Sequence, residues 1–194
     1  MSKRIALLSA AAFSALALTA AVVAPVSAQD KMMKSEMSGE KTVMVGGAPM
    51  YPSKNIVENA AKSKDHTTLV TAVKAAGLVD TLEGKGPFTV FAPTNAAFGK
   101  LPAGTVDNLV KPENKKTLTK ILTYHVVPGK LEASDLTDGK KLKTVEGEEL
   151  TVKKSGDSVM IVDAKGGSAT VTIPNVNQSN GVIHVVDTVL MPAS

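Results

Sequence analysis

Residues 86–98 of the chain read GPFTVFAPTNAAF, and this stretch predicts a loop, a short strand and the start of a helix. Gly86-Pro87 interrupts whatever precedes it, and the aromatic and β-branched residues 88–91 favour a strand. Pro93 has no N–H to donate and ends the strand, so Thr94 or Asn95 is expected to cap the helix. Three of the four phenylalanines of the chain lie here, which predicts that the stretch marks the packing centre.

Two later segments complete a pattern with this stretch. Residues 121–129 read ILTYHVVPG and residues 180–187 read NGVIHVVD. In this order the three segments resemble the fasciclin (FAS1) domain family, in which two signature segments flank a Tyr-His motif. The resemblance extends from about Asn55 to Pro192. One departure is Asn95, where many members carry Asp; because an amide also caps a helix, little structural consequence is expected.

The resemblance implies an α+β fold, a compact wedge of two small, mostly antiparallel β-sheets with several helices packed at one side. It also implies a set of core signature positions, which are Phe88, Phe91, Thr94, Asn95, Phe98, Asn180, Gly181, His184 and Asp187.

The residue pattern itself agrees with this fold class. Helical spacing or capping signals begin at Asn55, at His66 (to Ala76), at residues 78–82 and 105–110, and at Pro112. Short β-branched segments follow, at residues 124–127, 142–145, 149–153, 158–162, 169–173 and 182–190. Helices first and strands later predict one α+β domain with mostly antiparallel pairing, since no internal repeat appears.

Three regions are expected along the chain. Residues 1–28 have a basic start, an apolar run and a small-residue cleavage site, which are typical of an export signal of a secreted or periplasmic protein. Residues 29–52 mix lysine, glutamate, serine and methionine without periodicity and predict a flexible tether. Residues 53–194 are expected to form the FAS1 domain, with no stable membrane insertion once the signal is cleaved.

Composition excludes several classes of function. The leader holds two of the 22 basic residues and none of the 18 acidic ones, so the mature chain has a net charge of +2. Arg4 is the only arginine and aromatic residues are few, so nucleic acid is not expected as a partner. The absence of cysteine excludes disulfides and thiolate metal sites, and no cofactor or metal is predicted.

Few residues in the chain suggest catalysis. None of the three histidines has the i, i+4 partner of a zinc-protease helix, and no serine lies in a Gly-x-Ser-x-Gly elbow. The acidic clusters near Asp135 and Glu146 lie beside lysines and are interpreted as solvated loop charges. The chain is therefore predicted not to be an enzyme, with an uncharacterised hydrolase kept as an alternative.

Tyr124-His125 is the motif with two interpretations. Apolar neighbours, Leu122, Val126, Val127 and Leu131, imply that the pair is buried and pins a helix-to-strand junction. In animal members of the family, however, this segment resembles an integrin-binding determinant. Alternation within residues 182–186 predicts that His184 meets a polar partner across the sheet, and His66 is expected at the surface.

The function predicted by the resemblance is non-catalytic adhesion by an exported monomer, of the bacterial single-domain type. Its partner would be a protein or polysaccharide of a cell surface or extracellular matrix. The main alternative is a periplasmic carrier of a small ligand in a pocket, or of copper, because five of the eight methionines lie in residues 29–52.

Overall fold

The centre of the fold is a parallel pair of strands, β3 (Phe88–Pro93) and β9 (Gly181–Val186), which come from the two signature segments. Phe88 lies opposite Gly181 and Phe91 opposite His184. Both strands are buried along most of their length, as expected for parallel strands covered on two faces. The computed structural model describes residues 41–193, so the predicted signal peptide and residues 29–40 of the predicted tether lie outside the described residues.

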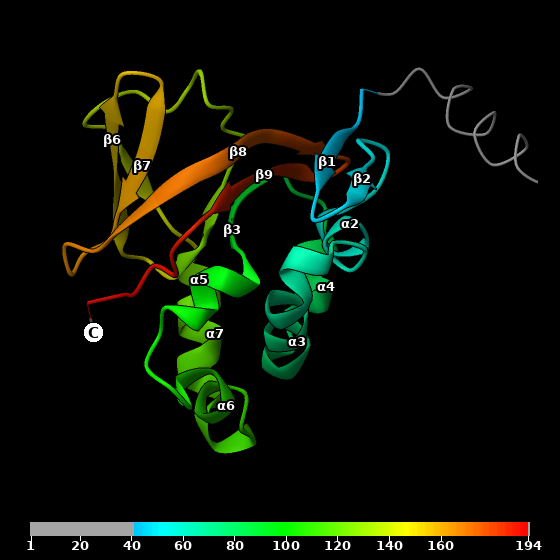
Figure 1. Ribbon diagram of the computed structural model, residues 1–194, viewed down its shortest axis with the longest axis vertical. Coiled ribbons are helices and arrows are strands. Elements are labelled where there is room, and N and C mark those ends of the chain that lie inside the picture. Colours follow the sequence, from blue (N-terminus) through cyan, green and yellow to red (C-terminus); the bar gives the residue numbers. More distant parts are fainter. Residues whose placement is uncertain (1–40, 194) are drawn as a thin grey trace, which may run out of the picture. The chain divides into compact units, whose positions relative to one another are not determined.

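The other strands extend a seven-stranded sheet on both sides of this pair, in the order β4-β3-β9-β8-β7-β6-β5 (Figure 1). These strands are β4 (Val126–Pro128), β5 (Lys141–Lys143), β6 (Glu149–Ser155), β7 (Ser158–Val162) and β8 (Ser168–Gln178). Apart from β3 with β9, all strand pairs of the described chain are antiparallel. A separate hairpin joins β1 (Val43–Val45) to β2 (Ala48–Met50).

The helices fall into two groups in the sequence. Before β3 come α2 (Ile56–Ala60), η1 (Lys64–His66), α3 (Thr67–Ala76) and α4 (Val79–Glu83). Between β3 and β4 come α5 (Asn95–Gly99), α6 (Thr105–Leu109), η2 (Pro112–Asn114) and α7 (Lys115–Tyr124). Figure 1 shows both groups on one side of the sheet, so the expected α+β FAS1 architecture is confirmed.

Two hydrophobic cores lie on opposite faces of the central strands, because side chains alternate along a strand. Val90, Ala92, Ile183 and Val185 join the helices in the first core. Phe91 and Val186 join the second core, which β5, β6 and β7 cover with residues such as Leu150 and Ile161. The phenylalanine-rich stretch therefore contributes to both cores and separates them.

Three helix ends have the capping contacts that the sequence predicts. Asn55 and Glu58 form a reciprocal capping box, with Glu58 N–H donating to Asn55 Oδ1 at 2.8 Å. Thr94 caps α5 by accepting from the N–H of Ala97. Gly77 ends α3 with a φ of 73°, a left-handed conformation that favours glycine.

Several predicted strand boundaries are wrong, and three of them matter for the site. Tyr124 is the last residue of α7, and the following strand begins at Val126. Strand β8 continues to Gln178 because a bulge around Pro174-Asn175 carries it past the proline, and Asn175 has a φ of 56°. Strand β9 ends at Val186, where Asp187 leaves the ladder.

The predicted tether is also too long at its C-terminal end. Residues 43–50 form the β1–β2 hairpin, and Val45 and Met50 are each only 3% exposed in the first core. Gly46-Gly47, with φ of 58° and 75°, makes the tight turn. The hairpin is therefore part of the folded unit. Among residues 41–193, no helix is long and apolar enough to cross a membrane.

Candidate binding site

Tyr124 lies at the C-terminal end of α7 and is fully buried in the second core. Its hydroxyl accepts a hydrogen bond from Ala164 N–H at 2.9 Å and lies 3.5 Å from the Glu149 carbonyl. Burial raises the pKa of this phenol, although the Ala164 N–H acts in the opposite direction. Tyr124 therefore joins α7 to the β7–β8 turn and stays a neutral hydrogen-bonding group.

His125 is buried next to Tyr124 and uses both ring nitrogens. Nδ1–H donates to the Ile121 carbonyl at 2.8 Å, and Nε2 accepts from Leu190 N–H at 3.0 Å. Burial lowers its pKa to about 4, because the interior disfavours the charged imidazolium. The ring is thus neutral at physiological pH and joins the end of α7 to the segment after β9.

His184 is the third buried group of this kind and has the opposite tautomer. Its Nε2–H donates to the Leu131 carbonyl at 2.7 Å, and its Nδ1 accepts from Asn175 N–H at 3.3 Å. The ring stacks on Phe91 with a centroid separation of 5.7 Å. Burial lowers its pKa. The polar partner expected across the sheet is the backbone N–H of Asn175 on β8.

Asn180 and Gly181 join the start of α2 and the end of α4 to the sheet. Asn180 Oδ1 accepts from Ile56 N–H at 3.1 Å, and its Nδ2 donates to the Leu82 and Gly84 carbonyls. A side chain on Gly181 would overlap the Phe88 carbonyl of the neighbouring strand. Both residues therefore position the backbone.

Asn95 begins α5 and also joins it to the segment that leads into α3. Its Oδ1 accepts from Thr68 N–H at 3.0 Å, and its Nδ2 donates to the Lys64 carbonyl at 2.8 Å. Asp187, at the end of β9, accepts from Thr170 N–H at 2.8 Å and pairs with Lys100 at 3.3 Å. Burial raises the Asp187 pKa, but these hydrogen bonds and the lysine outweigh it and leave that pKa lowered.

Sequence reasoning placed His66 at the surface, and this expectation is wrong. The ring is 3% exposed at the start of α3, and Nδ1 lies 2.9 Å from Ser63 Oγ. Nε2 makes no hydrogen bond. Burial lowers its pKa, and the nearby Ala92 carbonyl and the Asp65 carboxylate offset part of that effect.

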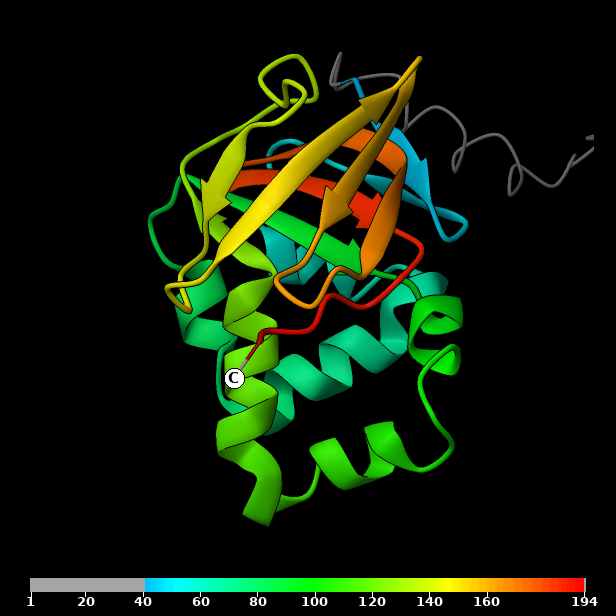
Figure 2. The same ribbon diagram turned by 90° about the vertical axis from the view of Figure 1, so that its left-hand side faces the viewer.

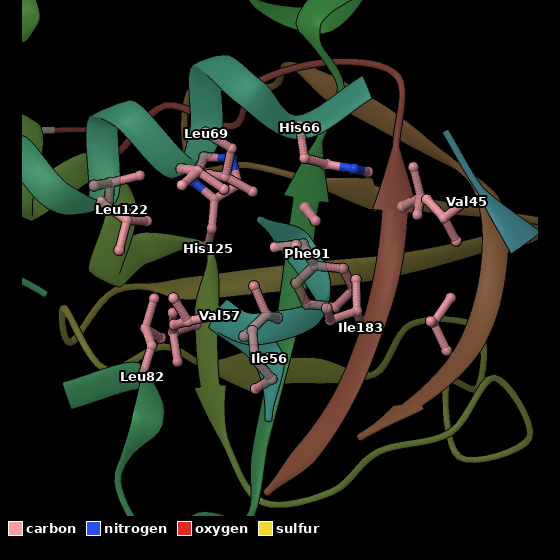
Figure 3. Close-up of a pocket in the computed structure, with 18 of the residues that line it drawn as sticks. Val45, Ile56, Val57, His66, Leu69, Leu82, Phe91, Leu122, His125 and Ile183 are labelled. Atoms are coloured by element: carbon pink, nitrogen blue, oxygen red, sulfur yellow. The ribbon is translucent and has the colours of Figure 1, made fainter. Parts of the chain in front are cut away.

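An apolar pocket lies beside His66, between α2, α3 and α4 and the central strands (Figure 3). The cavity has a volume of about 40 Å³. Its walls include Ile56, Leu69, Leu82 and Ile183, and the only lining residues with polar side chains are His66, Lys74 and His125. The three-residue apolar spacing along α3 was visible in the sequence, but the Ser63–His66 contact that turns the ring inward was not.

The buried carboxylate of Asp163 was also missed. It is 8% exposed and accepts from Lys165, Gly167 and Met191 N–H groups at 2.7–3.1 Å. These bonds hold the β7–β8 turn against the C-terminal segment. Asp163 sits in the Asp-Ala-Lys-Gly-Gly turn, where its residue type signals a turn but not its long-range partner.

The described residues bring no acid, base and nucleophile together in an open site. No group of three or more His, Cys, Asp or Glu residues between 41 and 193 is arranged to hold a metal ion. Of the methionines proposed for copper, Met50 is buried in the first core and Met44 is 59% exposed, while Met32, Met33 and Met37 lie outside the described residues.

The accessible candidate surface is the side of β5, β6 and β7 that faces away from the second core (Figure 2). We call it the outer face. Alternation places on it Lys141, Lys143, Glu149, Thr151, Lys153, Met160 and Val162. Lys141 pairs with Glu149 at 3.3 Å. This face therefore combines exposed lysines with half-buried apolar side chains.

The predicted Tyr-His segment is not part of this surface. Tyr124, His125, Leu122, Val126 and Val127 are buried, and only Leu131 is partly exposed. These five side chains are therefore not exposed to a partner.

Comparison with known proteins gives consistent matches. The Fasciclin domain family model matches residues 64–192. The chain is 50% identical over 153 residues to Protein sll1483 of Synechocystis sp., covering 79% of this chain and 82% of that protein. It is 40% identical over 138 residues to Immunogenic protein MPT70 of Mycobacterium tuberculosis, covering 69% of this chain and 66% of that protein.

Two further matches concern surface proteins. Cell surface glycolipoprotein MPB83 of Mycobacterium bovis is 45% identical over 115 residues, or 59% of this chain and 48% of that protein. A solved FAS1 domain pair from the insect cell adhesion molecule fasciclin I has a TM-score of 0.65 at 19% identity. That match covers 73% of this chain and 52% of the solved chain, and it supports the fold alone.

Proposed function

The chain belongs to the fasciclin domain family, and we propose that it is an exported, non-catalytic adhesion module. In this proposal it acts outside the cytoplasm, secreted or periplasmic, and binds a cell-surface protein or polysaccharide. The name of a cell surface glycolipoprotein among its relatives supports this class of function.

The observation that carries the proposal is the state of two imidazoles, those of His125 and His184. His125 and His184 are buried, and each has both ring nitrogens engaged with backbone groups. A general base must reach the proton it abstracts and keep a free nitrogen for it. The rings of His125 and His184 therefore stabilise the fold and are not available as general bases. Binding through the accessible surface is the function that we propose instead.

We assign the contact to the outer face. Lys143 and Lys153 project from neighbouring strands, and the half-buried Met160 and Val162 lie beside them. Lysines attract anionic groups of a polysaccharide or protein, and apolar side chains add contact area. A single module with a contact of this kind binds modestly, so strong attachment requires many copies on one surface.

The experiment is a sedimentation assay of the mature protein with envelopes from cells that produce it. Lys143→Ser/Lys153→Ser is the test variant, and Lys111→Ser/Lys116→Ser removes two exposed lysines elsewhere as a matched control. Binding should fall several-fold for the test variant only. Envelopes treated with protease or with glycosidases distinguish a protein partner from a polysaccharide. Equal binding by all three proteins would reject the outer face.

A screen of esterase and glycosidase substrates tests the non-catalytic part. No turnover should exceed the background of a His125→Gln variant. Turnover that disappears with one imidazole would make the protein a hydrolase.

A further inference from the structure

Asn180-Gly181 is the only asparagine–glycine pair in the chain. An asparagine loses its amide most readily in this pair, because glycine leaves its own backbone nitrogen unshielded and its backbone free to rotate. Asn180 lies in the turn between β8 and β9, and Gly181 is the first residue of β9. A chemically labile amide therefore lies in the turn that starts a central strand.

Loss of this amide needs only water as a co-reactant. The Gly181 nitrogen attacks Asn180 Cγ and closes a succinimide ring. The bond from Cγ to Nδ2 breaks, and the amide nitrogen leaves as ammonia with the proton of the Gly181 N–H. Water then opens either of the two ring bonds to the nitrogen. One product has aspartate at position 180, and the other has isoaspartate, whose side-chain carbon becomes an extra atom of the main chain.

The folded chain holds the Asn180 side chain away from this reaction. Oδ1 accepts from Ile56 N–H at 3.1 Å, and Nδ2 donates to the Leu82 carbonyl at 2.6 Å and to the Gly84 carbonyl at 3.2 Å. Ring closure requires the side chain to turn back onto its own backbone. It would therefore break these hydrogen bonds to α2 and to the end of α4.

The attacking residue, Gly181, is fixed as well. It pairs with Phe88 of β3 and with Gln178 of β8, and Phe88 N–H donates to the Asn180 carbonyl at 3.0 Å. A Cβ on Gly181 would overlap the Phe88 carbonyl, so the two backbones lie too close for this residue to shift. The glycine that permits this close approach also makes Asn180 labile, and the folded state suppresses the reaction.

We propose that Asn180 is a deamidation site that reacts only when the β8–β9 turn opens, and that the reaction prevents the chain from refolding. Aspartate cannot donate, so a carboxylate oxygen would face the Leu82 and Gly84 carbonyls in place of the amide N–H groups. Isoaspartate would add a main-chain atom where the backbones of Gly86 and Phe88 already touch the turn. Chemical modification of the unfolded chain thus makes unfolding irreversible. This inference does not depend on the outer face or on adhesion.

The first experiment compares the rate of deamidation in the folded and the unfolded protein. The mature protein is kept at mildly alkaline pH, in buffer or in guanidinium chloride, and is then digested at mildly acidic pH, where the reaction is slow. Mass spectrometry of the peptides gives the converted fraction of Asn180. We expect conversion at least about a hundredfold faster in the denaturant, because the folded chain must open before the attack. Asn108, exposed and followed by leucine, is the internal control and should convert far more slowly than Asn180 in the denaturant.

The second experiment follows refolding. Samples are held in the denaturant for increasing times, diluted into buffer, and separated into compact and expanded species by size-exclusion chromatography. A sample diluted at once gives the recovery of the unmodified chain. The compact fraction should fall as Asn180 converts. It should contain intact Asn180, while aspartate and isoaspartate collect in the expanded fraction.

A matched pair of variants tests the consequence of the conversion. Asn180→Asp should unfold at a lower denaturant concentration than the parent or fail to fold, whereas Asn108→Asp should match the parent. Three results would overturn the proposal. They are equal rates of Asn180 conversion in buffer and in denaturant, a compact fraction as rich in converted Asn180 as the expanded fraction, and an Asn180→Asp variant as stable as the parent.

Discussion

The Tyr-His motif is a structural joint built from two neighbouring side chains. The Tyr124 hydroxyl accepts from the β7–β8 turn, and His125 accepts from Leu190 N–H in the C-terminal segment. Helix α7 therefore ends against two segments that are distant in sequence. Loss of either side chain leaves a buried N–H unpaired, which costs about 1–3 kcal/mol.

His125 predicts a pH-dependent stability. Its pKa is about 4 in the folded protein and 6.5 in the unfolded chain, so the unfolded state binds the proton more readily. The contribution is complete above pH 6.5 and is lost as pH falls through 4, a change of up to about 3 kcal/mol. Urea unfolding between pH 7 and pH 4 measures it.

A His125→Gln variant is the control for this slope. It should be less stable at pH 7 and should lose less stability than the parent on acidification. His66 and His184 also have lowered pKa values and act in the same direction, so part of the slope remains. A parent whose free energy of unfolding is constant from pH 7 to pH 4 contradicts the burial of these rings.

Asn95→Asp, a change toward the residue of many family members, is predicted to destabilise this chain. A carboxylate can accept from Thr68 N–H but cannot donate to the Lys64 carbonyl, as the amide does. The expected loss is about 1–2 kcal/mol in thermal or urea unfolding. Asn108→Asp, on exposed α6, should be nearly neutral. Equal effects at the two positions would argue against the Lys64 contact.

At the level of elements, the β1–β2 hairpin is a folded segment that the sequence pattern did not reveal. Three-residue strands rich in methionine give too little periodicity to stand out from a polar segment. The turn signal was present in Gly46-Gly47, but turn residues alone do not reveal that Val45 and Met50 reach the core.

Gly46 and Gly47 provide a matched test of the hairpin. Both have positive φ, so alanine is strained at either position. A Cβ at Gly46 would also overlap Ser63 Oγ and lie 2.8 Å from the Asp65 nitrogen, whereas one at Gly47 meets nothing within 4 Å. Gly46→Ala should therefore lower the free energy of unfolding by about 1–3 kcal/mol more than Gly47→Ala. Identical unfolding curves would mean that the hairpin is not packed there.

Some strands could be predicted from local sequence and others could not. Residues 158–162 form β7 as predicted, because β-branched residues between turn signals are a local cue. Strand β8 passes a proline through a bulge, and Asn175 there is held by a bond from Ala133 N–H to its Oδ1. His66 turns inward toward side chains of the central strands, such as Ile183, and those neighbours are distant in sequence.

In the folded unit of residues 41–193, the β3–β9 pair separates two cores. The first core, between helices and sheet, contains the apolar pocket, and the second core supports the outer face. The fasciclin signature segments lie on the dividing strands, where Phe91 and Ile183 line the apolar pocket and no signature residue belongs to the outer face.

We propose that this protein binds through its outer face and that its Tyr-His motif serves only the fold. The most direct measurement is envelope binding by Lys143→Ser/Lys153→Ser and by Tyr124→Phe, each at a temperature where circular dichroism shows it folded. The lysine variant should keep its melting temperature and lose binding. Tyr124→Phe should lose stability and keep binding. A folded Tyr124→Phe protein that no longer binds, beside a lysine variant that still does, would contradict it.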